Sequence, residues 1–204
     1  MVNRTVYLLR HGRIQLPDSQ RRFIGQVDLP LNEEGIRQAY LLQQIFDKVH
    51  IDAVFCSDLT RSCQMAEIIA ANKDIPITAW RGFREISVGE WEGCTFADIA
   101  QRFPDEFKAR GADIANYRVP GGESFAECAT RVVAAFDEML EAASGDILLS
   151  GHAGINRLLL CHILGMPISN LFRIDQDYAC INVIKCAKSE YHVKTLNASN
   201  HLSN

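Results

Sequence analysis

The stretch Thr5-Val6-Tyr7-Leu8-Leu9 runs directly into Arg10-His11-Gly12. It is short, apolar and rich in β-branched and aromatic residues, which predicts a buried strand with charged side chains at its carboxyl end. Two further runs share this pattern, Ile51–Cys56 and Ile147–Ser150, and longer helical stretches separate the three. The sequence therefore predicts an α/β fold in three layers, with a mostly parallel central sheet flanked by helices.

Each expected helix has a recognisable start or stop signal in the sequence. The expected helices are Glu33–Val49 capped by Asn32, a helix begun by Thr95 with Asp98, a helix from Ser124 with Glu127 toward Ala143, and a helix after His152 that passes Arg157 and ends at Leu164 before Gly165. The chain is expected to close with two strands, Cys180–Cys186 and Tyr191–Leu196, paired as a hairpin across Ala187–Glu190.

Composition narrows the class of protein. The chain has 204 residues, 48% of them hydrophobic and 23% charged, which is the balance of a single domain spanning residues 1–204. Its 21 Lys and Arg against 25 Asp and Glu give a net charge of −4, so we expect neither a nucleic-acid nor a membrane partner. No signal peptide or membrane span is apparent, and the seven cysteines form no C-x-x-C pair. We therefore expect a cytoplasmic protein with reduced thiols, and no metal or cofactor.

Two arginines and two histidines are expected to meet at one edge of this sheet. Arg10 and His11 follow the first strand, Arg61 lies just beyond the second, and His152 follows the third. Taken singly, a strand-end histidine also fits a structural role, and Arg61 also fits a surface ion pair. Together they predict a positive pocket for a tetrahedral dianion at the carboxyl ends of the strands, with a histidine as nucleophile toward phosphorus.

Phosphoryl transfer also needs an acid, because an alkoxide leaves poorly without a proton. Glu85, Glu90 and Glu92 are all available in the stretch Phe83–Gly93, and composition does not choose among them. Glu90 and Glu92 flank Trp91 and also fit a solvated face, whereas Glu85 has the apolar residues Phe83 and Ile86 close by in the sequence and is expected to be partly buried.

Two loops, Arg13–Pro30 and Phe103–Pro120, are longer than connections usually need, which is typical of functional loops. The segment from Glu90 to Glu127 holds eight acidic residues against four basic ones. We expect an acidic lid or insert at about residues 86–122 that covers the pocket and disfavours heavily phosphorylated substrates by like-charge repulsion.

Several separated motifs resemble the histidine phosphatase superfamily, also called phosphoglycerate mutase-like, in the same order along the chain from about Thr5 to Val183. The α-ribazole phosphatase branch looks closest. The motifs are Leu9–Gly12, Ser57–Arg61, Glu85 with Gly89–Gly93, and Ser150–Gly154 with Arg157, joined by Arg22–Leu31 and Pro120–Ser124.

The resemblance implies that His11 is phosphorylated on its outer ring nitrogen, and that Glu85 protonates the leaving group and then deprotonates the attacking water. It implies that Arg10, Arg61 and His152 hold the phosphate oxygens without a metal ion. In the Arg22–Leu31 stretch we take Gly25 and Gln26 as substrate-binding residues. The arginines are expected to lower the pKa of His11, which keeps the imidazole neutral and nucleophilic.

This chain departs from the family pattern at two places. Arg13-Ile14 stands where an acidic or amide residue followed by Thr or Ser is usual, so Arg13 is either an extra substrate contact or a surface charge. Met65 stands where Thr is common, which we expect to be a difference in packing.

The leading function is hydrolysis of a small phosphorylated metabolite through a phosphohistidine, with α-ribazole 5′-phosphate suggested as the substrate. The alternatives are a phosphoglycerate mutase and a non-catalytic protein that binds a phosphorylated metabolite. The closing strands Cys180–Leu196 offer an edge through which a homodimer could form.

Overall fold

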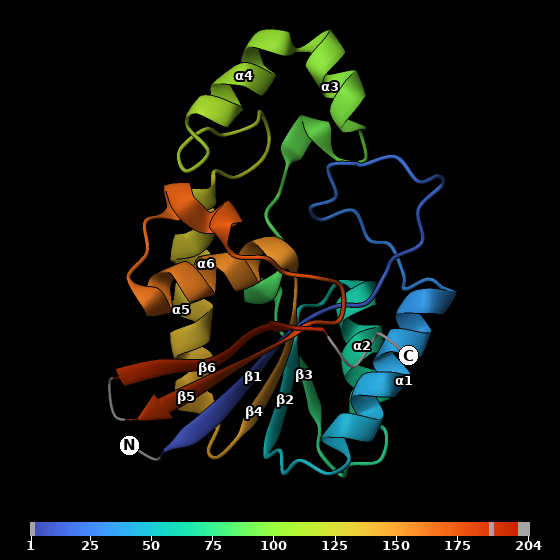
Figure 1. The fold of residues 1–204 in the computed structure, drawn as a ribbon, viewed down its shortest axis with the longest axis vertical. Coiled ribbons are helices and arrows are strands. Elements are labelled where there is room, and N and C mark those ends of the chain that lie inside the picture. Colours follow the sequence, from blue (N-terminus) through green and yellow to red (C-terminus); the bar gives the residue numbers. More distant parts are fainter. Residues whose placement is uncertain (1–2, 188–189, 200–204) are drawn as a thin grey trace.

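A six-stranded sheet forms the centre of the protein in the computed structural model, which describes residues 3–187 and 190–199. The strands lie in the order β3-β2-β4-β1-β5-β6, and those from β3 to β1 run parallel while β5 and β6 are antiparallel (Figure 1). The strands are β1 Arg4–Arg10, β2 Ala53–Cys56, β3 Ile77–Ala79, β4 Ile147–Gly151, β5 Ile181–Ala187 and β6 Glu190–Ala198. The expected mostly parallel α/β sheet is therefore confirmed.

The closing hairpin is also confirmed, since β5 and β6 pair antiparallel with Ala187 opposite Glu190. Its turn, residues 188–189, lies outside the described residues. The short strand β3 was not predicted from the sequence.

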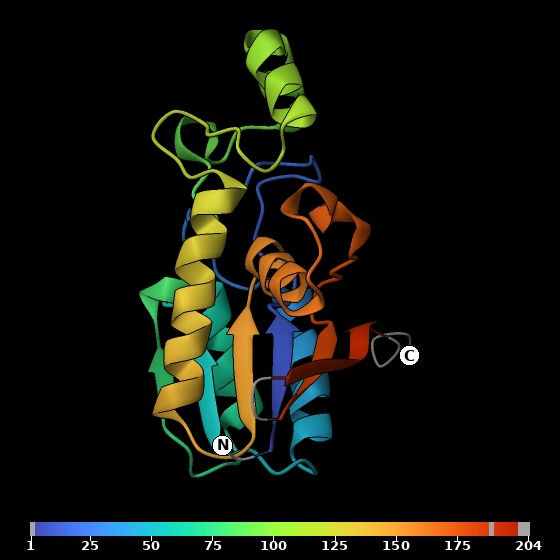
Figure 2. The same ribbon diagram turned by 90° about the vertical axis from the view of Figure 1, so that its left-hand side faces the viewer.

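Helices cover both faces of the sheet and complete the three layers (Figures 1 and 2). On one face, α1 Glu33–Phe46 packs against α2 Thr60–Ala70. On the opposite face, α5 Phe125–Ala142 packs against α6 Ala153–Leu164. Short 3-10 helices lie at η1 Arg81–Phe83, η2 Gly89–Trp91 and η3 Ile168–Arg173.

The capping residues predicted from the sequence form the expected hydrogen bonds at the helix starts. The side chain of Asn32 accepts a hydrogen bond from the Gly35 N–H, and both capping boxes form, at Thr95 and at Ser124. The helix α6 ends at Gly165, whose φ of 62° is the left-handed conformation that glycine adopts without strain. Helix α1 ends three residues before the predicted Val49.

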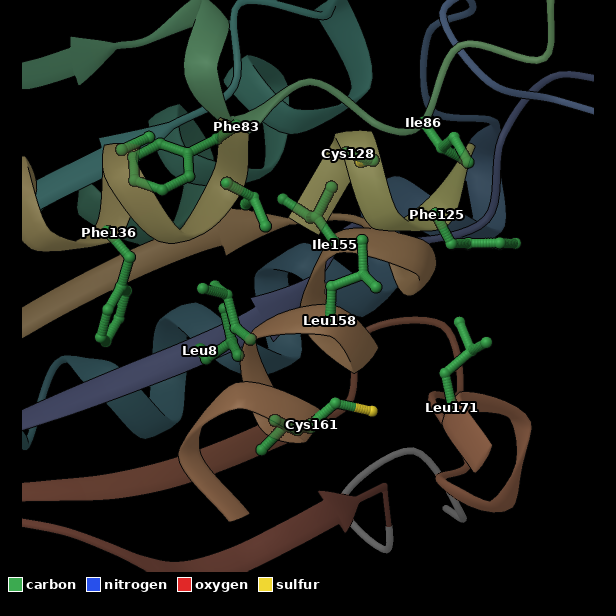
Figure 3. Close-up of a cluster of buried hydrophobic side chains, with 14 of the residues drawn as sticks. Leu8, Phe83, Ile86, Phe125, Cys128, Phe136, Ile155, Leu158, Cys161 and Leu171 are labelled. Carbon is green, nitrogen blue, oxygen red and sulfur yellow. The ribbon is translucent and has the colours of Figure 1, made fainter. Parts of the chain in front are cut away.

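Successive side chains of the central strands point to opposite faces of the sheet and pack into two separate hydrophobic cores. Leu8 of β1 packs with α5 and α6, whereas the next residue, Leu9, packs with α1 and α2, and both are fully buried. Figure 3 shows the first core, in which Leu8, Phe136, Ile155 and Leu158 meet between β1, α5 and α6. At about 25 cal/mol per Å² of apolar surface, such burial is the main stabilising contribution. It fixes the strand ends from which the site is built.

The expected loop Phe103–Pro120 is wrong in its first half, which forms helix α4, Pro104–Ala112, directly after α3, Phe96–Arg102. Proline occupies the first turn of α4, where its missing N–H costs nothing, and Asp105 and Glu106 complement the helix dipole there. No residue of α4 is buried, so the sequence carries no amphipathic pattern to reveal it. The two helices lie at the far end of the molecule from β2 and β3 (Figure 1).

None of the described helices is long and apolar enough to cross a membrane. All seven cysteines are free thiols, and five of them are buried.

Candidate active site

The carboxyl ends of three parallel strands bring the predicted cationic and imidazole side chains together. His11 follows β1, and its backbone N–H donates to the Gly151 carbonyl oxygen at the end of β4, 3.1 Å away. The rings of His11 and His152 lie 5.1 Å apart, and Arg61 is the second residue of α2. We call Arg10, His11, Arg61 and His152 the phosphate floor. A cavity of about 370 Å³ is lined by Arg10, His11 and Arg61 of this floor and by Glu85, while His152 lies fully buried behind them.

The backbone fixes the tautomer of His11. Its Nδ1 lies 2.7 Å from the carbonyl oxygen of Gly12, which can only accept, so Nδ1 carries the proton and Nε2 carries the lone pair. Burial, and then the charges of Arg61 and Arg10, lower the pKa of His11 well below its usual value. The imidazole is therefore neutral, as the sequence predicted, although burial contributes more than the arginines do.

Arg61 is buried and joins the floor to the loop of residues 13–30. Its Nε donates to His152 Nδ1 at 3.3 Å, and its terminal nitrogens donate to the carbonyl oxygens of Val27 and Gly25 at 2.8 and 2.6 Å. Because Nδ1 of His152 accepts, Nε2 carries the proton and donates to Ser57 Oγ at 2.6 Å. Burial and the charge of Arg61 hold the pKa of His152 well below its usual value.

Arg10 is held from the other side by residues that the sequence analysis missed. Its guanidinium carbon lies 3.7 Å from the centre of the Tyr178 ring, and one terminal nitrogen donates to Gln176 O at 2.6 Å. The Gln176 side chain is buried in a network of amides with Asn156 and Asn182. The side-chain amides of Asn156 and Asn182 also donate to the backbone carbonyl oxygens of Leu9 and Leu8 in β1. No local sequence signal marks this support, because its members come from α6, the loop after η3, and β5.

Glu85 is the one glutamate of the three candidates that lines this cavity. It is 7% exposed, and its carboxylate accepts from the N–H groups of Gly154 and Ile155 at the start of α6, at 2.8 and 3.2 Å. A Cβ at Gly154 would lie 2.3 Å from the Glu85 carboxylate, so only glycine permits this approach. The neighbouring Arg84 forms two hydrogen bonds with Asp58, at 2.6 and 2.7 Å, which ties the Glu85 segment to the connection between β2 and α2.

Glu92 is not part of a solvated face, which corrects one interpretation left open by the sequence. Its carboxylate accepts from the backbone N–H groups of Gly25, Gln26 and Val27, at 3.1, 2.7 and 3.3 Å, and also from that of Val88. It therefore holds the turn whose carbonyl groups hold Arg61. Glu90, by contrast, is exposed.

Gly25 and Gln26 lie beside the floor but direct their polar groups at protein. The Gly25 carbonyl accepts from Arg61, and the Gln26 amide donates to the Glu85 carbonyl at 3.0 Å. The adjacent residue Ile24 lines the cavity in their place. In this structure both residues position Arg61 and Glu85.

The two departures from the family pattern occupy different environments, since Arg13 lines the cavity and Met65 lies in a core. Arg13 is exposed and lines the cavity, with its guanidinium 5.4 Å from the Tyr178 ring centre, whereas Ile14 is buried. Met65 is fully buried in the core shared by α1 and α2, which fits the expected difference in packing.

A second cavity of about 510 Å³ adjoins the first and shares five lining residues with it, Arg21, Arg22, Ile24, Glu85 and Ala153. The segment 86–122 contributes Ile86, Val88, Phe96, Arg110, Gly111 and Ile114 to its wall. None of the carboxylates of that segment lines either cavity. The expected repulsion of polyanions by an acidic lid is therefore not built into these walls, because the acidic side chains face elsewhere.

Within residues 3–187 and 190–199, no group of three or more His, Cys, Asp or Glu side chains is placed to hold a metal ion.

Comparison with known proteins places this geometry in context. The family model of the histidine phosphatase superfamily (branch 1) matches residues 6–199. The adenosylcobalamin/alpha-ribazole phosphatase of Salmonella typhimurium is 28% identical over 195 residues, covering 95% of this chain and 96% of that protein. A Yersinia pestis protein named "Probable phosphoglycerate mutase GpmB" is 36% identical over 163 residues, covering 79% of this chain and 75% of that protein.

A further relative is the 6-phosphofructo-2-kinase/fructose-2,6-bisphosphatase of Caenorhabditis elegans, 29% identical over 196 residues; the match covers 94% of this chain but only 40% of that protein. Among solved structures, the alpha-ribazole phosphatase from Shigella flexneri matches with a TM-score of 0.88 at 26% identity, covering 95% of this chain and 96% of that chain.

Proposed function

Because this chain belongs to the histidine phosphatase superfamily, branch 1, we propose that it hydrolyses a small phosphomonoester through a phosphohistidine formed on His11. The observation that carries the proposal is the state of that side chain. Its Nδ1 proton is held by the Gly12 carbonyl, and a pKa lowered by burial and then by two arginines leaves Nε2 unprotonated and free to attack. A neutral imidazole in this position is a competent nucleophile toward phosphorus.

In the first step, the Nε2 lone pair of His11 forms a bond to phosphorus while the bond from phosphorus to the leaving oxygen breaks. Glu85 gives its proton to that oxygen. In the second step, a water oxygen attacks phosphorus, the bond between nitrogen and phosphorus breaks, and Glu85 takes the proton of the water. The enzyme returns to its starting state with inorganic phosphate and an alcohol as products.

We assign Arg10 and Arg61 to the oxygens of the transferring phosphoryl group, and we assign His152, whose two ring nitrogens are bonded to Ser57 and Arg61, to the positioning of Arg61. Arg10 and Arg61 line the cavity beside His11, and His152 keeps Arg61 in place through its Nδ1. Fixed guanidinium groups stabilise charge that develops in the transition state without having to reorganise.

The test is hydrolysis of p-nitrophenyl phosphate in the presence of a chelator. We expect steady turnover by the unchanged protein and a loss of about 10⁴-fold or more in His11→Ala, since the nucleophile is removed. His162→Ala, on the exposed side of α6, is the matched control and retains activity. An unchanged protein no faster than His11→Ala would contradict the proposal and leave a binding protein as the alternative.

The role of Glu85 is tested by comparing leaving groups. Glu85→Gln is expected to slow alkyl phosphates by about 100-fold and aryl phosphates by less than about 10-fold, because a phenolate leaves with little help from an acid. An equal loss on both classes would show that Glu85 is structural.

Two substrates follow from the relatives. The Salmonella and Shigella phosphatases are named for α-ribazole, so α-ribazole 5′-phosphate heads a panel of metabolite phosphates scored by phosphate release. The Yersinia relative carries the mutase name, so 3-phosphoglycerate with bisphosphoglycerate is the second assay. Formation of 2-phosphoglycerate in place of free phosphate would identify a mutase.

A further inference from the structure

The second cavity offers an apolar wall to whatever is attached to the phosphate. Phe23, Phe96, Phe125 and Phe172 line it, together with Ile86 and Ile114. It meets the first cavity at Glu85, the proposed proton donor to the leaving group. The leaving group is therefore expected to extend from the phosphate floor into this space.

Charge in this wall is almost entirely positive. Glu85 is the one acidic residue that lines the second cavity, against four arginines. Two of those arginines have polar partners, since Arg22 pairs with Asp18 at 2.6 Å and Arg157 donates to Ile174 O at 2.7 Å. The guanidinium groups of these two arginines are therefore already bonded to acceptors of the protein.

Arg21 and Arg110 differ from these two, and we call this pair the cationic rim. Neither side chain forms a hydrogen bond or ion pair with the described part of the chain; both lie against aromatic rings instead. The guanidinium carbon of Arg21 is 4.2 Å from the Phe96 ring centre, and that of Arg110 is 5.4 Å from the Phe23 ring centre. Phe23 and Phe96 are stacked on each other with centres 4.0 Å apart.

The rim joins two segments that are far apart in sequence. Arg21 comes from the loop of residues 13–30 and Arg110 from α4, and Figure 1 shows both segments at the same end of the molecule. Arg110 is half-buried. Burial lowers its pKa, and the positive charge of Arg21 acts in the same direction. Two cations brought together without an anion are unfavourable, and a bound anion would relieve the repulsion.

We propose that Arg21 and Arg110 form a second anion-binding site, and that the substrate is a phosphomonoester whose leaving group carries its own anionic group beyond an apolar body. A carboxylate and a second phosphate share the required chemistry, since a guanidinium pairs with either. The proposal rests on the function proposed above. It replaces the expectation that the segment 86–122 repels polyanions.

The test uses isosteric substrates that differ only in charge. 4-Carboxyphenyl phosphate and 4-carbamoylphenyl phosphate form one pair, the naphthalene analogues with a longer reach form another, and 1,4-phenylene bisphosphate is the phosphate arm. We expect kcat/KM to favour the carboxylate over the amide by about 10-fold or more in at least one pair, mainly through KM. A higher kcat/KM for the bisphosphate than for the carboxylate would assign the site to a phosphate.

The variants are Arg21→Gln, Arg110→Gln and the double substitution. The preference for the anionic member is expected to fall below about twofold in the double variant. Arg102→Gln is the matched control, because Arg102 is exposed on α3, lies against Phe103 and lines neither cavity. No preference in the unchanged protein, or a preference that survives the double substitution, would overturn the proposal.

Binding separates this proposal from the proposed function. 4-Carboxybenzylphosphonate and 4-carbamoylbenzylphosphonate are not hydrolysed, and calorimetric titration compares their affinities directly. Tighter binding of the carboxylate, lost in the double variant, together with no phosphate release from any substrate, would reject the phosphatase and keep the second anion site. Hydrolysis of both members of each pair at equal kcat/KM, with equal affinity for the two phosphonates, would reject the second anion site and keep the phosphatase.

Discussion

The phosphate floor and the cationic rim are both built from positive or imidazole side chains, yet they are held in opposite ways. In the floor, Arg61 uses its Nε and both terminal nitrogens on protein acceptors, and His152 has a partner on each ring nitrogen. In the rim, Arg21 and Arg110 rest on aromatic rings without a polar partner among the described residues.

The difference teaches how one fold separates chemistry from selectivity. A transition state is stabilised best by groups that do not move, which requires supporting hydrogen bonds. Recognition of a leaving group needs donors left unsatisfied until the ligand arrives, which the rim supplies. Substitutions in the floor should therefore affect every substrate alike, and those in the rim should depend on the leaving group.

Among substitutions that compare the floor with the rim, the largest effect is expected for Arg61→Lys, which tests whether the floor is indifferent to the leaving group. A lysine cannot reach His152, Val27 and Gly25 together, so the loss of kcat/KM should be about 100-fold or more. It should be the same for 4-carboxyphenyl and 4-carbamoylphenyl phosphate. Arg37→Lys, on the exposed surface of α1, is the control. A loss below about 10-fold, or one that depends on the charge of the leaving group, would break the distinction.

The buried histidines of the floor should make stability depend on pH. His11 and His152 have lowered pKa values when folded, so the unfolded chain binds more protons below about pH 6.5 and stability is lost as pH falls through this range. The free energy of unfolding should drop by about 2 to 3 kcal/mol between pH 7.5 and 5.5, with each histidine contributing about 1.4 kcal/mol over this whole range.

Urea titrations across this range measure the drop, and His152→Gln should reduce the slope by about half. A free energy of unfolding that stays constant from pH 7.5 to 5.5 would show that the histidines are not buried as neutral bases.

Glu92→Gln should weaken the floor indirectly. The amide replaces one acceptor oxygen with a donor among backbone N–H groups, so we expect a loss of about 1 to 3 kcal/mol of stability and about 10-fold in kcat/KM. Glu90→Gln, an exposed neighbour, is the matched control. Thermal melting and p-nitrophenyl phosphate turnover measure the two effects, and equal behaviour of both variants would remove Glu92 from the support of Arg61.

The smallest effect is expected at Tyr178, where the floor uses an aromatic ring as the rim does. Tyr178→Leu removes the ring stacked on Arg10, which should raise KM by about threefold for all substrates. Tyr178→Phe keeps the ring and should restore most of the affinity. If the phenylalanine variant is as impaired as the leucine variant, the hydroxyl rather than the ring supports Arg10.

The sequence predicted those parts of the molecule that depend on local pattern. The strands predicted to end at Leu9, Cys56 and Ser150 end within one residue of those positions, and the cap at Asn32 and both capping boxes also follow from spacing over a few residues. Strand β3 was missed because three residues show no alternation, and α4 was missed because none of its residues is fully buried.

The supports of the site escaped prediction for a different reason. Glu92 lies 65 to 67 positions from the N–H groups that it accepts from in the loop of residues 13–30, and Arg84 lies 26 from Asp58. Whether a carboxylate is solvated or buried among donors depends on such distant partners. The same reason explains the acidic segment, whose total charge gave no indication of which side chains face the cavities.

Arg61 connects the phosphate floor with the loop of residues 13–30, which carries Arg21. The carbonyl groups of Gly25 and Val27 accept from this guanidinium, so the side chain that belongs to the floor also holds the turn at residues 25–27, four positions from Arg21. The spacing between the floor and the start of the rim is therefore set by contacts within the protein. A substrate that spans both bears no cost for ordering this turn, which favours tight and selective binding without a closing movement.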